Sequence, residues 1–258
     1  MDVGAYDDEL LAAIYDDDNR DGPDHDYFRA LADEVSASCI TDLGCGTGIL
    51  TVTLAKKGRR VTGIDPAATM LSRAASRPGG DQVEWRLGAS ELIDRDANDL
   101  IVMSGNVAMQ IIDGAWTATL LDIAQGLKPG GRLVFETRNP LNEPWKAWGG
   151  LAEARETSVG TLRQTESVSD PDSDGLVTMT TSACPVSVRA DGVDAIHQTG
   201  FLLTWAHGWT RRTHGQGMGD HRTIAAGQRQ GPPMARSPAG DQWNPMETTH
   251  RSALARRP

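Results

Sequence analysis

The feature that most constrains this chain is the segment Cys39–Ala55, in which a short apolar run stops at three glycines on alternate positions, Gly44, Gly46 and Gly48. Leucines at helical spacing begin directly after the last glycine. Strand, glycine turn and helix, in this order, bring the backbone of an open α/β sheet close to a ligand at the carboxyl end of a strand. Glycine suits such a turn because it adopts positive φ and has no Cβ. The segment therefore predicts a ligand-binding turn at the start of a sheet.

Alternating apolar and polar patterns continue through the first half of the chain. We expect further strands at 60–66, 83–88, 99–106 and 132–138, and helices at 6–18, 27–35, 67–75 and 116–127. Strands that alternate with helices form parallel βαβ units. The predicted fold class is α/β, a doubly wound Rossmann-like sheet.

The pattern changes after Pro140. Two β-rich segments at 157–168 and 176–188, separated by a turn-forming stretch, predict an inserted β-hairpin that would serve as a substrate lid. From about residue 207 the chain has few apolar residues and many Gly, Pro and Arg, which is typical of a disordered tail. We therefore expect a helical cap at 1–38, a ligand-binding core at 39–140, a β-rich substrate-side segment at 141–206 and a disordered tail at 207–258.

Composition excludes several classes of protein. The net charge of −10 argues against a nucleic-acid partner, because a phosphate backbone requires basic surface. Acidic residues gather before residue 35 and basic ones after residue 197, and we interpret both groups as solvated surface. The three cysteines have no metal-ligand spacing, so no metal is expected. We find no signal peptide and no membrane-spanning run, and we expect a cytoplasmic protein.

The spacing of the glycines limits which class of ligand the turn can bind. A dinucleotide fingerprint requires a glycine at position 49, where this chain has Ile49. The turn is instead Asp42-x-Gly44-x-Gly46-x-Gly48. The second strand ends at Asp65, a carboxylate placed to accept hydrogen bonds from both hydroxyls of a ribose.

With these motifs the chain resembles a class I S-adenosylmethionine-dependent methyltransferase of the bacterial, small-molecule kind. The resemblance covers roughly residues 5–190 and rests on matched stretches at 42–48, 63–66, 87–88, 99–105 and 127–133. It implies S-adenosyl-L-methionine as cofactor and a small molecule as methyl acceptor.

The resemblance also implies roles for single residues. The three glycines would pass beside the methionine part of the cofactor, and Asp42 would hold its amino group directly or through water. Asp65 would bind the ribose and Pro66 would flank the adenine. Ser104 and Gly105 would close the pocket where the methyl group leaves. Cys45 lies in the same turn, where we interpret it as a small filler and not as a nucleophile.

One position departs from the family pattern. The family often has Asp after the glycine that ends the third strand, where it accepts from the adenine amino group; this chain has Ala89. We therefore expect the adenine contact to come from backbone or from Ser90, with weaker fixation.

The acceptor side is less defined. Tyr15 and Tyr27, with Phe28, would either form a wall of the ligand site or pack their helices onto the core, and Asn106 would orient an acceptor. His25 and Asp26 are possible bases, although a surface turn is the favoured interpretation, and no convincing catalytic residue is found. The Asn/Asp-Pro-Pro-aromatic signature of nucleic-acid amine methylation is absent.

The end of the chain raises an alternative. Members of the family normally finish with a helix and two strands, and after Val188 we find one candidate strand, Phe201–Trp205. We hypothesise a replaced ending, for example by a frameshift, which would leave the fifth strand with an unprotected edge. A cofactor-binding protein of weak or no activity is therefore a second hypothesis, and a nicotinamide-dependent oxidoreductase is a distant third.

Overall fold

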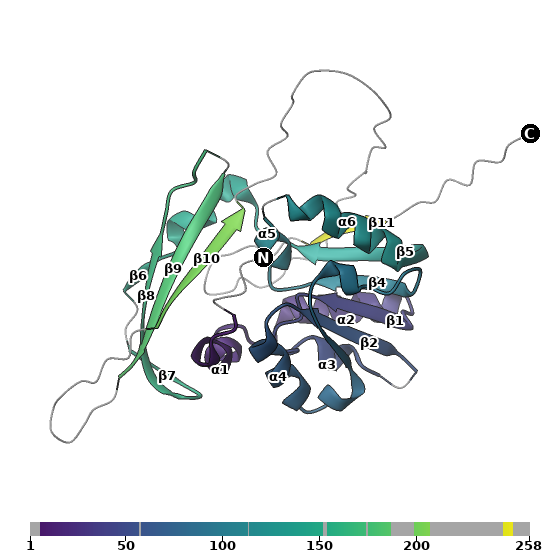
Figure 1. Cartoon of the computed structure of the whole chain (residues 1–258), viewed down its shortest axis with the longest axis horizontal. Coiled ribbons are helices and arrows are strands. Elements are labelled where there is room, and N and C mark those ends of the chain that lie inside the picture. The colour runs from purple at the N-terminus through teal and green to yellow at the C-terminus, as the bar shows by residue number, and fades with distance from the viewer. Residues whose placement is uncertain are drawn as a thin grey trace, which may run out of the picture.

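A computed structural model describes residues 6–56, 58–112, 114–151, 154–173, 175–186, 199–206 and 245–249. It contains two separate β-sheets, with helix α1 (Glu9–Asp18) lying between them (Figure 1). The larger sheet carries the glycine turn, and the smaller one is built from the segment that follows Pro140.

The larger sheet is parallel through its first five strands and has the order β5-β4-β1-β2-β3. Its strands are β1 (Cys39–Leu43), β2 (Arg60–Asp65), β3 (Glu84–Leu87), β4 (Asn98–Met103) and β5 (Leu127–Glu136). Strand order reverses between β1 and β4, and ligands of open α/β sheets bind at the carboxyl ends of the strands beside such a reversal. The predicted doubly wound sheet is confirmed.

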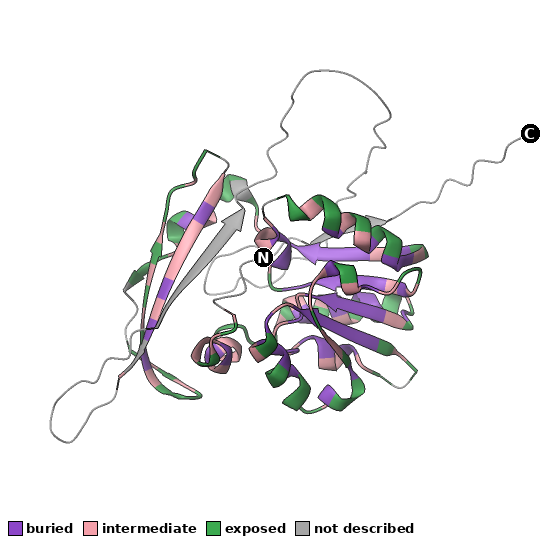
Figure 2. Ribbon diagram, in the orientation of Figure 1, coloured by how far each residue is buried: buried purple, intermediate pink, exposed green. Residues whose placement is uncertain are grey.

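Two apolar clusters cover the two faces of this sheet. Because side chains alternate along a strand, Leu100 and Val102 of β4 point into one cluster while Ile101 and Met103 point into the other. Burial on both faces explains why β4 is continuously apolar in its middle (Figure 2). The first cluster contains side chains of α2 (Pro23–Glu34) and α3 (Thr51–Leu54), and the second contains side chains of α5 (Val107–Gln110) and α6 (Ala115–Gly126).

Other predicted elements differ in extent. The helix after the glycine turn, α3, has only four residues, whereas α4 (Ala68–Ser76) matches its predicted range closely. The Lys128–Gly131 stretch, which separates the predicted helix at 116–127 from the predicted strand at 132–138, lies within β5 where the register with β4 shifts. Short 3-10 helices complete the chain at Gly80–Gln82, Ser90–Leu92, Pro140–Asn142 and Pro144–Ala147.

The predicted hairpin is confirmed as β8 (Gly160–Val168) paired antiparallel with β9 (Leu176–Pro185). It is the centre of a larger sheet that the sequence did not reveal. The added strands are β6 (Gly150–Leu151), β7 (Arg155–Thr157) and β10 (Thr199–Ala206), in the order β10-β9-β8-β6 with β7 also on β8. Strand β10 contains the candidate strand Phe201–Trp205.

The expected unprotected edge of the fifth strand is wrong. Strand β11 (Pro245–Thr249) pairs antiparallel with β5, from Pro245 opposite Glu136 to Thr249 opposite Arg132. The backbone groups on that edge therefore have a ladder partner within the chain. The rest of the predicted tail, 207–244 and 250–258, lies outside the described residues.

We predict that Leu100→Ala destabilises the fold by about 2–5 kcal/mol, because it removes a fully buried side chain from the centre of the sheet. Leu121→Ala on α6 is the matched control, since Leu121 is 57% exposed and its loss should change stability by less than about 0.5 kcal/mol. Urea unfolding followed by circular dichroism measures both. Equal midpoints for the two variants would contradict the assignment of this cluster as the core.

Candidate functional site

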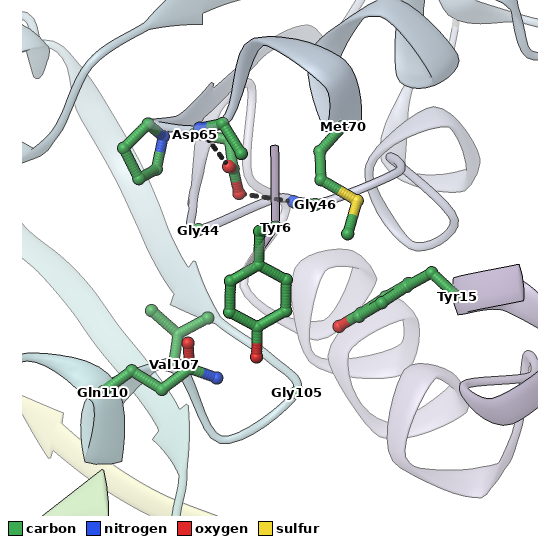
Figure 3. A pocket seen from close by; sticks show the side chains of 11 residues that line it. Tyr6, Tyr15, Gly44, Gly46, Asp65, Met70, Gly105, Val107 and Gln110 are labelled. Atoms are coloured by element: carbon green, nitrogen blue, oxygen red, sulfur yellow. Dashed lines mark hydrogen bonds between the residues drawn. The ribbon is translucent and has the colours of Figure 1, made fainter. Parts of the chain in front are cut away.

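A small cavity lies at the carboxyl ends of β1, β2 and β4, where the strand order reverses (Figure 3). Its volume is about 30 Å³, because the rings of Tyr6 and Tyr15 stand in it opposite the glycine turn. The lining combines the turn, the end of β2, the start of α4 and α5: Tyr6, Tyr15, Gly44, Gly46, Asp65, Pro66, Ala67, Met70, Gly105, Val107 and Gln110.

Asp65 joins the two strand ends that form the floor of this cavity. Its Oδ2 accepts a hydrogen bond from the Gly46 N–H at 2.8 Å, and its Oδ1 accepts from the Ala67 N–H at 2.9 Å. Burial raises the pKa of the carboxyl group, and the two N–H donors oppose that rise. Each carboxylate oxygen has two acceptor sites, so one on each oxygen remains for a ligand hydroxyl.

The three glycines do different work. Gly44 has φ +76° and a Cβ there would lie 2.5 Å from a methyl group of Val107. Gly46 has φ +53° and a Cβ there would point towards the cavity, with Tyr15 Cε1 the nearest atom at 3.8 Å. A Cβ on Gly48 would instead lie 2.7 Å from the ring of Trp85. Gly44 and Gly46 therefore shape the cavity, and Gly48 allows close packing beneath it.

Asp42 is fully buried next to the turn and does not line the cavity. Its Oδ2 accepts from the Thr51 hydroxyl at 2.7 Å, while its Oδ1 has no hydrogen-bond partner. Burial raises the pKa of this carboxyl group to about 6. A buried acceptor without a partner is costly unless a donor completes it. An ammonium group, reached directly or through one water, would satisfy Oδ1.

Cys45 packs inside the turn. It is buried, its Sγ lies 3.1 Å from the Cβ position of Gly63, and burial raises the pKa of its thiol well above the usual range. A thiol held in this neutral form is a filler, as the sequence suggested.

Three other predicted cofactor residues lie outside the cavity lining. The Ala89 N–H donates to Glu91 Oε1 at 3.1 Å, and the Ser90 hydroxyl donates to Asp122 Oδ2 at 2.6 Å. Ser104 is almost completely buried at the end of β4, next to Gly105, which does line the cavity. The adenine contacts expected of Ala89 and Ser90 stay predictions, and Ser90 would have to leave Asp122 to make one.

The predicted acceptor residues separate in the structure. Tyr15 lines the cavity, whereas Tyr27 packs against the first core cluster beside Phe28, which is the packing alternative raised above. Asn106 has φ +59°, and its N–H donates to Glu136 Oε1 at 3.2 Å. His25 is buried on α2, 2.9 Å from Asp21, rather than in a surface turn.

Sequence reasoning missed Tyr6, Met70, Val107 and Gln110 as cavity residues. Tyr6 packs edge-on against Tyr15, with ring centres 6.2 Å apart. Burial raises the pKa of Tyr6 to about 12 and that of Tyr15 further. Both phenols are therefore neutral near pH 7 and can donate hydrogen bonds, but they are poor bases.

Two absences hold for the part of the chain that the structure describes. No group of three His, Cys, Asp or Glu side chains there is arranged to hold a metal ion. No helix there has both the length and the apolarity needed to cross a bilayer.

Comparison with known proteins agrees with this geometry. Residues 40–131 match the family model of a methyltransferase domain. This part of the chain is a class I S-adenosylmethionine-dependent methyltransferase domain. The match spans β1 to the start of β5, so it includes the glycine turn, Asp65 and the end of β4.

The curated relatives are similar over the same region. The chain is 34% identical over 110 residues to a ubiquinone/menaquinone biosynthesis C-methyltransferase of Rubrivivax gelatinosus, covering 42% of each chain. It is 34% identical over 131 residues to a trans-aconitate 2-methyltransferase of Paracidovorax citrulli, covering 50% of this chain and 49% of that one. The matched region thus spans half or less of these relatives' length.

Among solved structures, an S-adenosylmethionine-dependent methyltransferase of Clostridium acetobutylicum superposes with a TM-score of 0.67 at 19% identity. The superposition covers 94% of this chain and 98% of that one. At this identity the likeness concerns the fold. It extends well beyond the residues matched by sequence.

The cavity residues fit the family's cofactor. Asp65 has acceptor sites free for a ribose, Asp42 Oδ1 lacks a donor, and Gly46 leaves the space of a Cβ open towards the cavity. The cofactor carries a positive sulfonium and an ammonium group, and two buried carboxylates beside the turn supply the opposite charge.

We predict that affinity for S-adenosylmethionine falls as the pH drops below about 6, because protonation of Asp42 removes the negative charge beside the cationic ligand. Asp42→Asn should bind weakly at every pH and lose this dependence. Calorimetric titration between pH 5 and 8 measures both. A pH profile that is the same in the variant would exclude Asp42 as the titrating group.

Asp42→Asn should weaken cofactor binding but should not weaken the fold. A carboxyl group whose pKa is raised on folding stabilises the fold less when it is ionised, so the stability difference between Asp42→Asn and wild type should shrink as the pH falls through about 6 towards 4. Asp42→Asn keeps an acceptor for Thr51 and should be at least as stable as wild type at pH 7.5, by up to about 3 kcal/mol. Urea unfolding without ligand tests this; a less stable variant would contradict it.

Proposed function

We propose that this protein is a methyltransferase that transfers the methyl group of S-adenosylmethionine to a small-molecule acceptor by in-line displacement. The observation that carries the proposal is the Asp65 carboxylate, held by the Gly46 and Ala67 N–H groups at the reversal of strand order. The family match over residues 40–131 supports it.

The cofactor supplies an activated methyl group on a positive sulfur. The chain has to hold the cofactor, align the acceptor with the methyl group and exclude water. Asp65 and the glycine turn serve the first task. Tyr15 and Tyr6 cover the cavity opposite the turn and serve the last, because their partly buried rings leave a cavity of only about 30 Å³.

A small-molecule acceptor is supported by the names of the relatives, which concern ubiquinone, menaquinone and trans-aconitate methylation. The acidic net charge argues against a nucleic acid. We propose that the acceptor enters from the side of the second sheet, which lies across α1 from the larger sheet (Figure 1). The cytoplasmic location stays a prediction.

The described cavity lining offers no good base. Its phenols are neutral, and its one carboxylate, Asp65, is held by two N–H groups at the ribose position. We therefore propose that the acceptor atom is nucleophilic without losing a proton inside this cavity. The same observation keeps open the second candidate, a protein that binds the cofactor but transfers methyl groups slowly or not at all.

Two experiments separate these functions. Calorimetric titration with S-adenosylmethionine and with NADH should give heat with the first ligand only, and binding of NADH alone would overturn the proposal. Incubation with labelled S-adenosylmethionine and a panel of metabolites, with separate detection of S-adenosylhomocysteine, should then give a methylated product. Cofactor binding without product from any acceptor would favour the second candidate.

Asp65→Asn should weaken S-adenosylmethionine binding by about 10- to 100-fold, because the amide has a single acceptor oxygen for two N–H donors and lacks the negative charge. Asp81→Asn, at an exposed aspartate, is the control and should bind like wild type. Calorimetry gives the affinity, and circular dichroism checks that both variants are folded. Equal affinity in the two variants would remove Asp65 from the site.

A further inference from the structure

Helix α1 carries three consecutive aspartates that lie between the two sheets, and each has a different partner. Successive residues of a helix point about 100° apart, so three in a row cannot share one face. Asp16 faces the methyltransferase domain, while Asp17 and Asp18 contact the second sheet. Tyr15, the residue before them, covers the cavity. The sequence analysis interpreted the acidic residues before residue 35 as solvated surface. In the structure, Asp16, Asp17 and Asp18 instead make specific contacts.

On the cofactor side, Asp16 connects the helix to the glycine turn. Its Oδ1 accepts from the Thr47 hydroxyl at 2.5 Å, and its Oδ2 pairs with the Arg77 guanidinium. Arg77 also donates to the Thr47 carbonyl at 3.0 Å, so the three residues form a closed set. Thr47 lies between Gly46 and Gly48, so this contact reaches the turn that shapes the cavity.

On the other side, the turn between β7 and β8 holds the same helix. The Ser158 N–H donates to Asp17 Oδ2 at 2.8 Å, and the Ser158 hydroxyl lies 2.9 Å from the same oxygen and 3.1 Å from the Ala13 carbonyl. The Arg155 guanidinium pairs with Asp18 at 2.6 Å. The Ser158 contacts join residues 141 and 145 positions apart in the chain.

Tyr15 makes these contacts relevant to the cavity. Its ring is 3.8 Å from the Cβ position of Gly46 and its hydroxyl is 3.8 Å from that of Gly105, so it spans the cavity between the ends of β1 and β4 (Figure 3). A cavity of about 30 Å³ is far smaller than a nucleoside cofactor. A bound cofactor therefore requires the Tyr15 ring to turn out of the cavity, and a shift of α1, which carries Tyr15, would open the same path for entry and exit.

We propose that Asp16, Asp17 and Asp18 are positioning residues that couple the second sheet to cofactor exchange. Asp16 aligns α1 with the glycine turn, and the β7–β8 hairpin, through Arg155 of β7 and Ser158 of the turn, holds α1 in place beside the bound cofactor. An acceptor that shifts the β7–β8 turn would thus change how long the cofactor stays. This inference rests on the proposed function, because it assumes that S-adenosylmethionine occupies this cavity.

The test compares exchange rates in variants that leave the cavity lining intact. In Asp17→Asn/Asp18→Asn, and separately in Arg155→Gln, we expect the association and dissociation rates of S-adenosylmethionine both to rise by about three- to tenfold, since each exposed polar contact is individually weak. The equilibrium affinity should change less than either rate. A chase of labelled S-adenosylmethionine with excess S-adenosylhomocysteine gives the dissociation rate.

Asp33→Asn is the matched control. Asp33 is a half-exposed aspartate with ion pairs to Lys56 and Arg59, and it is on α2, away from the second sheet. Its loss should leave both rates unchanged. Asp16→Asn should behave differently from the Asp17, Asp18 and Arg155 variants. It should weaken the equilibrium affinity for S-adenosylmethionine, because it disturbs the contact with Thr47 on the cofactor side.

Hydrogen exchange without ligand gives an independent readout. The amides of residues 9–18 should exchange faster in Asp17→Asn/Asp18→Asn and in Arg155→Gln than in wild type, and the amides of β1 and β4 should exchange at the same rate. The proposed coupling would be overturned if Asp17→Asn/Asp18→Asn and Arg155→Gln both kept the wild-type rates of cofactor exchange and of hydrogen exchange. The methyltransferase proposal would then remain intact. A folded wild-type chain that does not bind S-adenosylmethionine would instead overturn the proposed function itself. If the double variant does not fold, Arg155→Gln decides the outcome.

Discussion

The site depends on one carboxylate that joins two neighbouring strand ends. Asp65 accepts from Gly46 and from Ala67, so it connects the turn after β1 with the start of α4. The parallel register places Leu43 beside Ile64, which brings the two ends to the same level. Removing this group would leave one buried and one half-buried N–H donor without this partner, and the glycine turn without its fixed neighbour. The cavity floor is therefore built before any ligand arrives, at the expense of a buried charge.

Elements with a strong local pattern were predictable from the sequence. β1, β2 and β4 are short runs rich in apolar and β-branched residues and bounded by turn residues, and the continuous apolar middle of β4 follows from burial on both faces. The second sheet was only partly predictable, because β6 and β7 are two and three residues long and carry no periodic signal. β11 was missed for a related reason: its pairing with β5 is a contact between distant segments, and its five residues include a proline and polar side chains.

The residues of the candidate site also differ in whether a local sequence pattern could predict them. Gly44, Gly46 and Asp65 act through their own backbone or at the end of their own strand, so spacing alone located them. Tyr6 and Gln110 reach the cavity from segments that the motif does not include. Ser90 shows the opposite limit: its position after β3 suggested an adenine contact, but Asp122 on α6 takes its hydroxyl. Motif spacing cannot reveal such competition, since the partner comes from another part of the fold.

The acidic run on α1 shows why charge patterns alone are ambiguous. Twelve carboxylates before residue 35 read as solvated surface, because no cation nearby in the sequence could pair with most of them. The partners of Asp16, Asp17 and Asp18 are instead Thr47 and Arg77 on one side and Arg155 and Ser158 on the other. Each such contact is weak when exposed, so its main effect is on geometry rather than stability. A helix that both sheets hold through weak contacts can release and reclose, as a cover over a nearly filled cavity must if cofactor is to turn over.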